Sequence, residues 1–157
     1  MPGKPFFKQK KVSEFQEKVL EIRRVTRVVA GGKRFSFRAT VVLGDGKGRV
    51  GVGVAKGMDV AGSIEKAKRA AERAMLTVPL KENRTIPHDV DAKYSAAKVR
   101  LKPAGQGHGL IAGGSVRAVL EVAGVKDISA KILGRTTNKL TNALATIEAL
   151  KKLMTVK

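Results

Sequence analysis

The sequence predicts an α+β protein built from two parts in succession. Apolar residues recur with a period of two in residues 35–43 and 50–54, which is typical of half-buried strands. Apolar residues recur at three- and four-residue spacings in three later segments, which is typical of amphipathic helices. After the first of these segments, "VPLKENRTIP" (residues 78–87) places polar residues between two prolines and indicates a boundary. We therefore expect one domain over residues 14–80 and a second over residues 81–157.

The first domain is predicted to contain a three-stranded antiparallel sheet and one helix. Residues 19–29 are rich in β-branched side chains but carry charge on both alternating faces, so we expect a strand that is bulged or only partly covered. Gly31 and Gly32 follow, and we expect both to supply the positive φ of a hairpin turn. In the next strand Phe35 and Phe37 share the apolar face, and we interpret both rings as buried rather than as a platform for stacking bases.

The stretch "GDGKGRVGVGVAKG" (residues 44–57) contains the glycine pattern of a dinucleotide-binding loop. Such a loop requires a helix that begins at its glycines, because the pyrophosphate sits on the helix N-terminus. Here Val50, Val52 and Val54 alternate with glycines directly after the loop, so a hairpin leading into a strand is predicted instead. The glycines at 51 and 53 leave one strand face bare, either for close approach of another backbone or as part of a tight sheet.

The remaining elements follow from apolar spacing and end signals. A helix is predicted from about Asp59, its N-cap, to Met75. The second domain, a two-layer α+β unit in ββαβα order, begins with extended chain in which Lys98, Arg100 and Lys102 share one face. A helix that ends at Gly124, a short strand over residues 127–133 and a helix over about residues 138–154 complete the prediction.

Net charge limits the class of partner. The chain has 32 Lys and Arg against 13 Asp and Glu, a formal charge of +19, which favours a polyanion such as nucleic acid or an acidic membrane surface. No apolar run approaches membrane-spanning length and no signal peptide is evident, so we expect no membrane association. The absence of cysteine excludes disulfides, thiolate catalysis and cysteine-bound zinc, and it fits the cytoplasm.

Enzymatic and metal-binding roles have little support in the sequence. His88 and His108 lie in no ligand-spaced cluster, so we expect no metal, no cofactor and no catalytic residue. Asp89 and Asp91 share a strand face, which we interpret as salt-bridged rather than catalytic. The glycine loop over residues 105–114 precedes a helix, so its amides are candidates either to hold a phosphate oxygen or to contact a protein.

Aromatic residues make up only 4% of the chain, so we expect the protein to recognise phosphate, 2′-hydroxyl and shape in structured RNA rather than stacked single-stranded bases. Residues 1–13 are predicted to form a basic arm that carries Lys10 and Lys11. The candidate RNA-binding residues are Lys10, Lys11, Arg24, Arg27, Gly31, Gly32, Lys33, Arg34, Arg38, Arg49, Lys56, Lys66, Arg69, Arg73, Arg135 and Lys139. The candidate protein-contact residues are Gly107, Gly109, Gly113, Gly114 and Arg117. Arg117 is included because a cation in the first turn of a helix opposes the helix dipole and calls for an external anion.

Two long motifs carry a family resemblance. At "RRVTRVVAGGKRFSFRATVVLGDGKGRVGVGVAKG" and "GLIAGGSVRAVLEVAGVKDI" the chain resembles the bacterial type of the small-subunit ribosomal protein S5 family. The resemblance implies an N-terminal double-stranded-RNA-binding-like domain and a C-terminal α+β domain with a left-handed βαβ connection. It also implies binding to small-subunit ribosomal RNA, contacts with ribosomal proteins S4 and S8, a place in the ribosome near the path by which mRNA enters, and an influence on decoding accuracy. The hairpin loop over residues 26–34 is then expected to border the spectinomycin site.

One segment departs from the family pattern. Where the family usually has Gly-Ser-x-Asn-Pro-x-Asn before the last helix, this chain has "GRTTNKL" over residues 134–140. The added Arg135 and Lys139 are therefore candidates for direct RNA contact. Two other classes remain open from the residues alone: a free-standing RNA-processing factor with a duplex-RNA module, and a nucleotide-dependent enzyme, for which we expect no saturable nucleotide binding.

Overall fold

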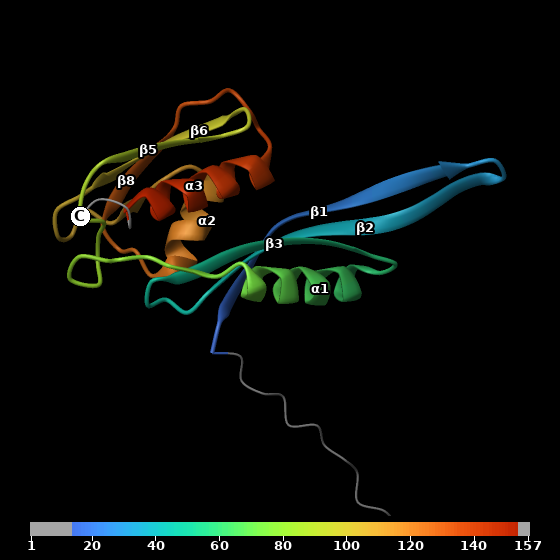
Figure 1. The fold of residues 1–157 in the computed structure, drawn as a ribbon, viewed down its shortest axis with the longest axis horizontal. Helices are drawn as coiled ribbons and strands as arrows, with labels where there is room; N and C mark the ends of the chain where they lie inside the picture. The colour runs from blue at the N-terminus through green and yellow to red at the C-terminus, as the bar shows by residue number, and fades with distance from the viewer. Residues whose placement is uncertain (1–13, 154–157) are drawn as a thin grey trace, which may run out of the picture.

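The computed structural model describes residues 14–153, which form two sheets and three helices (Figure 1). The arm with Lys10 and Lys11 lies outside the described residues. In chain order the elements are β1 (Gln16–Val29), β2 (Gly32–Gly44), β3 (Arg49–Gly57), α1 (Val60–Arg73), β4 (Leu76–Thr77), β5 (Val90–Tyr94), β6 (Ala97–Pro103), β7 (Leu110–Ile111), α2 (Gly114–Ala123), β8 (Ile128–Ile132) and α3 (Lys139–Leu153). The first sheet has the order β1-β2-β3-β4 and the second β5-β6-β8-β7, so the predicted α+β class is confirmed.

β1 and β2 form a long hairpin that projects away from the body of the molecule (Figure 1). The register shifts between Val19 and Glu21, which confirms the expected bulge. At the turn only Gly32 has a positive φ, +135°, so the expectation that Gly31 shares this conformation is wrong. The strands pair up to Val29 opposite Gly32, so Ala30 and Gly31 turn the chain and the positive φ falls on the first paired residue of β2.

The turn between β2 and β3 is the predicted hairpin. Gly46 and Gly48 have φ of +69° and +97°, and β3 pairs antiparallel with β2 from Gly44 opposite Val50 onward. A Cβ added at Gly51 or Gly53 would meet backbone atoms of α1, so these two glycines permit close approach of the helix backbone. Of the two interpretations of the bare strand face, close approach of another backbone is therefore the one that the structure supports.

α1 begins where its cap residue predicts. The Asp59 carboxylate accepts a hydrogen bond from the Gly62 amide at 3.4 Å, which confirms the N-cap. The helix ends at Arg73, two residues before Met75, and Leu76–Thr77 then forms β4, a short fourth strand that the apolar pattern did not predict. Two residues are too few to show a period, so such a strand is visible only through its pairing with β3.

The second sheet contains the two strands expected at the start of the second domain and one further short strand. β5 and β6 pair antiparallel, β8 pairs antiparallel with β6, and β7 pairs parallel with β8. β7 lies within the predicted glycine loop and is again only two residues long. α2 ends at Gly124, which has φ of +87° and confirms the predicted stop.

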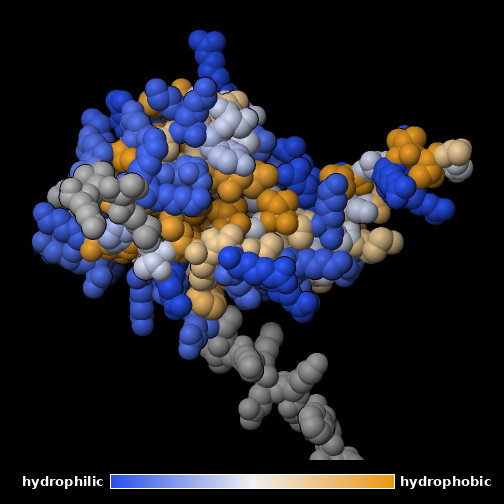
Figure 2. All heavy atoms as spheres, viewed as in Figure 1, coloured by the Kyte–Doolittle hydropathy of each residue, from blue (hydrophilic) through white to orange (hydrophobic). Residues whose placement is uncertain are grey.

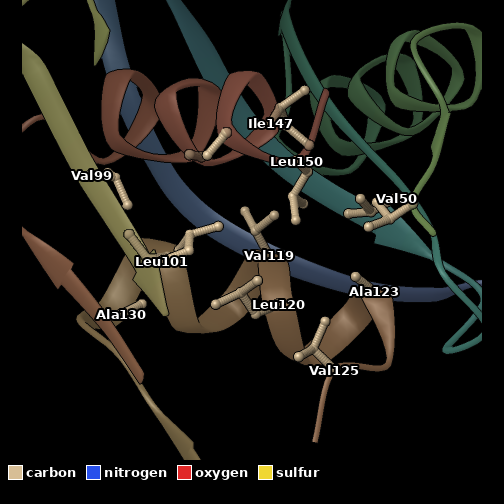
Figure 3. Packing of buried hydrophobic residues seen from close by; sticks show 14 of the residues in the cluster. Val50, Val99, Leu101, Val119, Leu120, Ala123, Val125, Ala130, Ile147 and Leu150 are labelled. Carbon is tan, nitrogen blue, oxygen red and sulfur yellow. The ribbon is translucent and has the colours of Figure 1, made fainter. Parts of the chain in front are cut away.

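The two halves share one hydrophobic core. Val42 and Val50 of the first sheet belong to the same buried cluster as Val119 of α2 and Leu150 of α3. Figure 3 shows Val50, Val119 and Leu150 in this cluster. The opposite face of the first sheet carries a smaller cluster in which Ala39 and Val41 meet Ala67 of α1. The body of the first sheet is thus covered on both faces, whereas the outer part of the β1–β2 hairpin is covered on neither. Within residues 14–153, no helix is long and apolar enough to cross a membrane.

Candidate nucleic-acid interface

One face of the β1–β2 hairpin carries cations directly opposite one another. The strand register pairs Arg23 with Arg38, Arg27 with Arg34, and Arg38 with Lys56 of β3. Directly opposite residues of antiparallel strands point to the same face, with Cβ atoms about 5 Å apart. We call these five residues, Arg23, Arg27, Arg34, Arg38 and Lys56, the cationic hairpin face. Four of them were predicted as RNA-binding residues, and Arg23 was not.

The cationic hairpin face has little internal charge compensation. Arg23 pairs with Glu21 at 2.8 Å, and no other member of the face has an ion pair with a residue of the described chain. Like charges directly opposite across a sheet destabilise it, on a scale of about 0.2–1 kcal/mol per pair. A surface that repeats this arrangement three times is suited to a polyanion, whose phosphates would screen each pair.

The opposite face of the hairpin is partly aromatic. The Arg24 guanidinium lies 4.6 Å from the centre of the Phe35 ring, and Phe35 is 47% exposed. The expectation that both phenylalanines are buried is therefore wrong for Phe35, and Phe37 is only half-buried. The reason is that β3 ends at Gly57 opposite Phe37, so the hairpin beyond this point is a two-stranded ribbon with no covering layer. Figure 2 shows hydrophobic residues together with hydrophilic ones on this projecting hairpin. Lys33 also points to this partly aromatic side of the hairpin, opposite to the cationic hairpin face.

A second group of predicted cations lies on α1. Lys66, Arg69 and Arg73 follow three- and four-residue spacings and are exposed, so they form one stripe. α1 packs on the sheet face that carries Ala39 and Val41, whereas the cationic hairpin face points to the opposite side. Two groups of the predicted RNA-binding residues therefore lie on opposite sides of the first sheet.

The other predicted cations are placed separately. Arg49 lies at the start of β3, where its Nε donates to Asp45 Oδ2 at 2.7 Å and its guanidinium carbon lies 5.4 Å from the Phe15 ring centre. Arg135 is exposed in the segment before α3. Lys139 begins α3, and its Nζ donates to the carbonyl of Leu20 at 3.4 Å. These three residues contribute to neither the cationic hairpin face nor the α1 stripe.

The glycine loop at residues 105–109 is organised by an internal carboxylate. Asp127 Oδ1 accepts hydrogen bonds from the amides of Gly107 (3.1 Å) and Gly109 (3.0 Å), and Oδ2 accepts from Arg84 Nε at 2.9 Å. The hydrogen bond from Gly109 lowers the pKa of the Asp127 carboxyl, burial opposes this, and Arg84 and the Gly107 amide lower it further. The interpretation that these amides hold a phosphate is therefore wrong for Gly107 and Gly109, because Asp127 already occupies them.

Arg117 lies in the first turn of α2, at the end that the sequence predicts to contact a protein. It is exposed, α2 has no acidic residue in its first turn, and within residues 14–153 Arg117 makes no ion pair. It lines a shallow cleft together with Gln16, Glu121 and Lys126. Gly113 is the N-cap residue of α2 without a side-chain hydrogen bond, and Gly114 is its first residue.

The comparisons with known proteins agree with this architecture. The family model "Ribosomal protein S5, N-terminal domain" matches residues 15–79, and "Ribosomal protein S5, C-terminal domain" matches residues 92–157. The chain belongs to the ribosomal protein S5 family. It is 53% identical over 144 residues to "Small ribosomal subunit protein uS5" of Gloeobacter violaceus, covering 92% of this chain and 64% of the relative.

Two further S5-family relatives are covered more completely. The chain is 50% identical to "Small ribosomal subunit protein uS5c" of Rhodomonas salina, covering 94% of this chain and 87% of the relative. It is also 50% identical to "Small ribosomal subunit protein uS5" of Synechococcus elongatus, covering 92% of this chain and 80% of the relative.

In this S5-family chain the outer face of the second sheet is also basic, which the predicted site residues did not include. The register places Lys93 opposite Lys98 and Lys131 opposite Arg100. Arg100 is neutralised by Asp91 through two contacts of 2.6 Å, which confirms the interpretation of Asp91 as salt-bridged. The alternation of cations in residues 98–102 is a sufficient sequence signal for this face. Among residues 14–153, no group of three or more potential metal ligands is present.

Proposed function

We propose that this S5-family protein is a structural, non-enzymatic constituent of the small ribosomal subunit that binds small-subunit ribosomal RNA in the cytoplasm. The relatives carry the name of a small ribosomal subunit protein, and this favours the ribosomal role over a free-standing RNA-processing factor. The observation that carries the RNA-binding part is the cationic hairpin face, where three cross-strand pairs of like charge are compensated by one described ion pair, Arg23 with Glu21.

The RNA contact is divided between two surfaces in this proposal. The cationic hairpin face and the tip at Gly31, Gly32 and Lys33 form the first, and the α1 stripe forms the second. Lys10, Lys11 and Arg135 add contacts outside these two surfaces. We assign the hairpin and α1 to a first domain over residues 14–80, and the α2 and α3 layer to a second domain over residues 81–157.

We also propose the protein neighbours. The N-terminal end of α2, with Gly113, Gly114 and Arg117, is suited to a protein carboxylate because Arg117 opposes the helix dipole and lacks an acidic partner within residues 14–153. Ribosomal proteins S4 and S8 are the partners in this proposal, with mRNA passing nearby and decoding accuracy as the property affected. Arg117→Ala is then expected to raise stop-codon readthrough in cells while the protein still assembles, and readthrough at the wild-type level would contradict this role.

The RNA-binding proposal is tested by salt titration of binding to small-subunit ribosomal RNA. The triple variant Arg27→Ala, Arg34→Ala, Arg38→Ala should reduce the slope of log affinity against log salt by roughly 0.9 for each phosphate that the protein no longer neutralises. The matched control, Lys93→Ala, Lys98→Ala, Lys102→Ala, removes the same charge from the second sheet and should change the slope less. A hairpin variant that binds with the wild-type slope would overturn the assignment of the hairpin.

A further inference from the structure

The outer face of the second sheet combines exposed lysines with exposed apolar side chains. The inner face of this sheet packs against α2 and α3, and Figure 1 shows both helices on the same side of β5, β6 and β8. The side chains that point away from the helices stay exposed within the described part of the chain. We call the following six exposed residues the second-sheet patch: Lys93, Lys98, Lys102, Lys131, Ile111 and Leu133.

The strand register places the four lysines on the same side of the sheet. Lys93 lies directly opposite Lys98. Lys131 lies opposite Arg100, which alternation puts between Lys98 and Lys102 on β6. Opposite side chains have Cβ atoms about 5 Å apart, and alternate residues of one strand lie about 7 Å apart. Among residues 14–153 none of the four lysines has an ion-pair or hydrogen-bond partner for its side chain, so their charges are free to meet a ligand.

Two apolar side chains border the lysines. Ile111 of β7 pairs with Ser129, which alternates with Lys131 on β8, so Ile111 points to the same side. Leu133 lies two residues beyond Lys131, and its amide donates to the carbonyl of Lys98 at 2.8 Å, so the ladder extends to Leu133. Ile111 is 53% exposed and Leu133 is 44% exposed. Removing these side chains from water is favourable where they meet another apolar surface.

The border of the patch along β5 is acidic. Asp89 and Asp91 line a hollow of about 280 Å³ together with Arg100 and Lys102. Arg100 is already neutralised there by Asp91. A continuous polyanion laid across this face would meet both carboxylates, whereas a protein surface can match lysines with acids and carboxylates with bases. The patch also contains no aromatic ring on which a base of RNA could stack.

We propose that the second-sheet patch is the docking surface for a protein that presents carboxylates to the four lysines and an apolar side chain to Ile111 and Leu133. The inference rests on the proposed ribosomal role and adds a protein contact to the one proposed at α2. Such interfaces combine apolar contact with complementary charge, which fixes the register and rejects other partners. A carboxylate between Lys93 and Lys98 would also relieve the repulsion of this cross-strand pair.

The first test is a zero-length cross-link in purified small subunits that contain the full chain. A water-soluble carbodiimide joins a lysine amine to a carboxylate that touches it, and the internal phosphodiesters of RNA give no such product. Mass spectrometry should find Lys98 or Lys131 joined to an Asp or Glu of another protein. After ultraviolet irradiation the same two lysines should carry no nucleotide, whereas peptides with Lys33 or Lys66 serve as the RNA-contact control.

Charge reversal tests the electrostatic part of the contact. Lys98→Glu with Lys131→Glu should lower the yield of cross-links at Lys93 and Lys102 at least about tenfold, because like charges then face each other across the interface. The matched control, Lys98→Arg with Lys131→Arg, keeps the charge and should leave those cross-links unchanged. If the reversed variant does not assemble, the cross-links of the wild-type subunits decide.

The apolar part has its own variant. Ile111→Ser with Leu133→Ser removes no charge and should also lower the yield of the lysine cross-links, because the apolar contact that holds the partner is lost. The slope of ribosomal RNA binding against salt should stay at the wild-type value in this variant. An unchanged cross-link yield would contradict the assignment of these two side chains to the interface.

Three outcomes would overturn the proposal as a whole. Nucleotide adducts on the patch lysines in place of carboxylate cross-links would assign the patch to RNA. A loss of salt slope in Lys93→Ala, Lys98→Ala, Lys102→Ala as large as that of the hairpin variant would do the same. Equal rates of lysine acetylation in the free protein and in small subunits would show that the patch faces solvent. Each outcome leaves the ribosomal role intact if the protein co-sediments with small subunits, and failure to co-sediment would contradict the proposed function instead.

Discussion

In each of the two glycine loops of this protein, at residues 44–49 and 105–109, one aspartate accepts hydrogen bonds from two loop amides and from an arginine Nε. The two loops differ in how far that aspartate lies from the loop along the chain. In the first, Asp45 accepts the amides of Lys47 (2.8 Å) and Arg49 (3.0 Å) and the Nε of Arg49 (2.7 Å). In the second, Asp127 accepts two glycine amides and the Nε of Arg84. One carboxylate is local and the other lies 18 to 20 residues away in the chain.

The comparison teaches what a glycine loop in a strongly basic protein can be for. Both loops are phosphate-binding candidates by composition. In both, an aspartate of the same chain accepts the amide hydrogen bonds that a phosphate would otherwise accept. The first loop uses two more amides, those of Gly46 and Gly48, to bind the carbonyls of Val122 (3.1 Å) and Ala123 (2.8 Å) at the end of α2. It therefore caps a helix C-terminus and joins the two halves of the molecule.

Breaking this junction should have the largest effect on stability. Gly124 has φ of +87°, and a Cβ there would meet the carbonyl of Gly46. Gly124→Val should therefore lower the free energy of unfolding by about 3 kcal/mol, from backbone strain and displacement of the first loop. Urea unfolding measures this, with Gly31→Val as control because nothing lies within 4 Å of a Cβ there. Equal unfolding midpoints for the two variants would contradict the junction.

The remote carboxylate should produce the larger pH effect of the two loops. The pKa of Asp127 lies below 3.8 in the folded protein, mainly because the Gly109 amide donates to it. A lowered pKa gives stability that is complete above the unfolded pKa and is lost as pH falls through the folded value. Stability should therefore fall below about pH 4, and Asp127→Asn should flatten this fall. The check is a series of urea unfolding curves at decreasing pH, and an Asp127→Asn curve parallel to wild type would refute the role of this carboxylate.

The local carboxylate should matter less. Burial raises the pKa of Asp45, but the hydrogen bonds from Arg49 and from the amides of Lys47 and Arg49 outweigh it, so the pKa is lowered. Asp45→Asn keeps one acceptor oxygen for the two amides of the same tight turn, so the loss of stability should be about 1 kcal/mol. The same unfolding series measures it, and a loss greater than that of Asp127→Asn would reverse the order proposed for the two loops.

The smallest expected effect concerns the binding of inorganic phosphate to the second loop. Inorganic phosphate added to the protein should leave the amide signals of Gly107 and Gly109 unshifted, because Asp127 occupies both. In Asp127→Asn the negative charge is removed, and phosphate should then shift them. Shifts of these two signals in the wild-type protein would show that the second loop is open to anions.

The two loops also show what sequence can predict. The hairpin at residues 44–49 follows from glycines between two strands, and a carboxylate two and four residues before its donors lies within the range of local turn geometry. The contact of Asp127 with Gly109 depends on the parallel pairing of β7 with β8, and a two-residue strand has no period to reveal it.

The candidate interface shows the same limit. Alternation places Arg34 and Arg38 on one face of β2, but which residues of β1 share that face depends on the bulge between Val19 and Glu21. A shift of one residue moves every side chain of a strand to the other face, so Arg23 was not identified.

The shared core has a consequence for the order in which a newly made chain folds. Val42 and Val50 are buried in the same cluster as Leu150 and Leu153, about a hundred positions later in the chain. During synthesis the inner face of the first sheet is thus fully covered only when α3, as well as α2, has left the ribosome. Contacts at such a separation form slowly, and the exposed apolar face is prone to association meanwhile. The final turns of α3 therefore complete the burial of a sheet that is synthesised first.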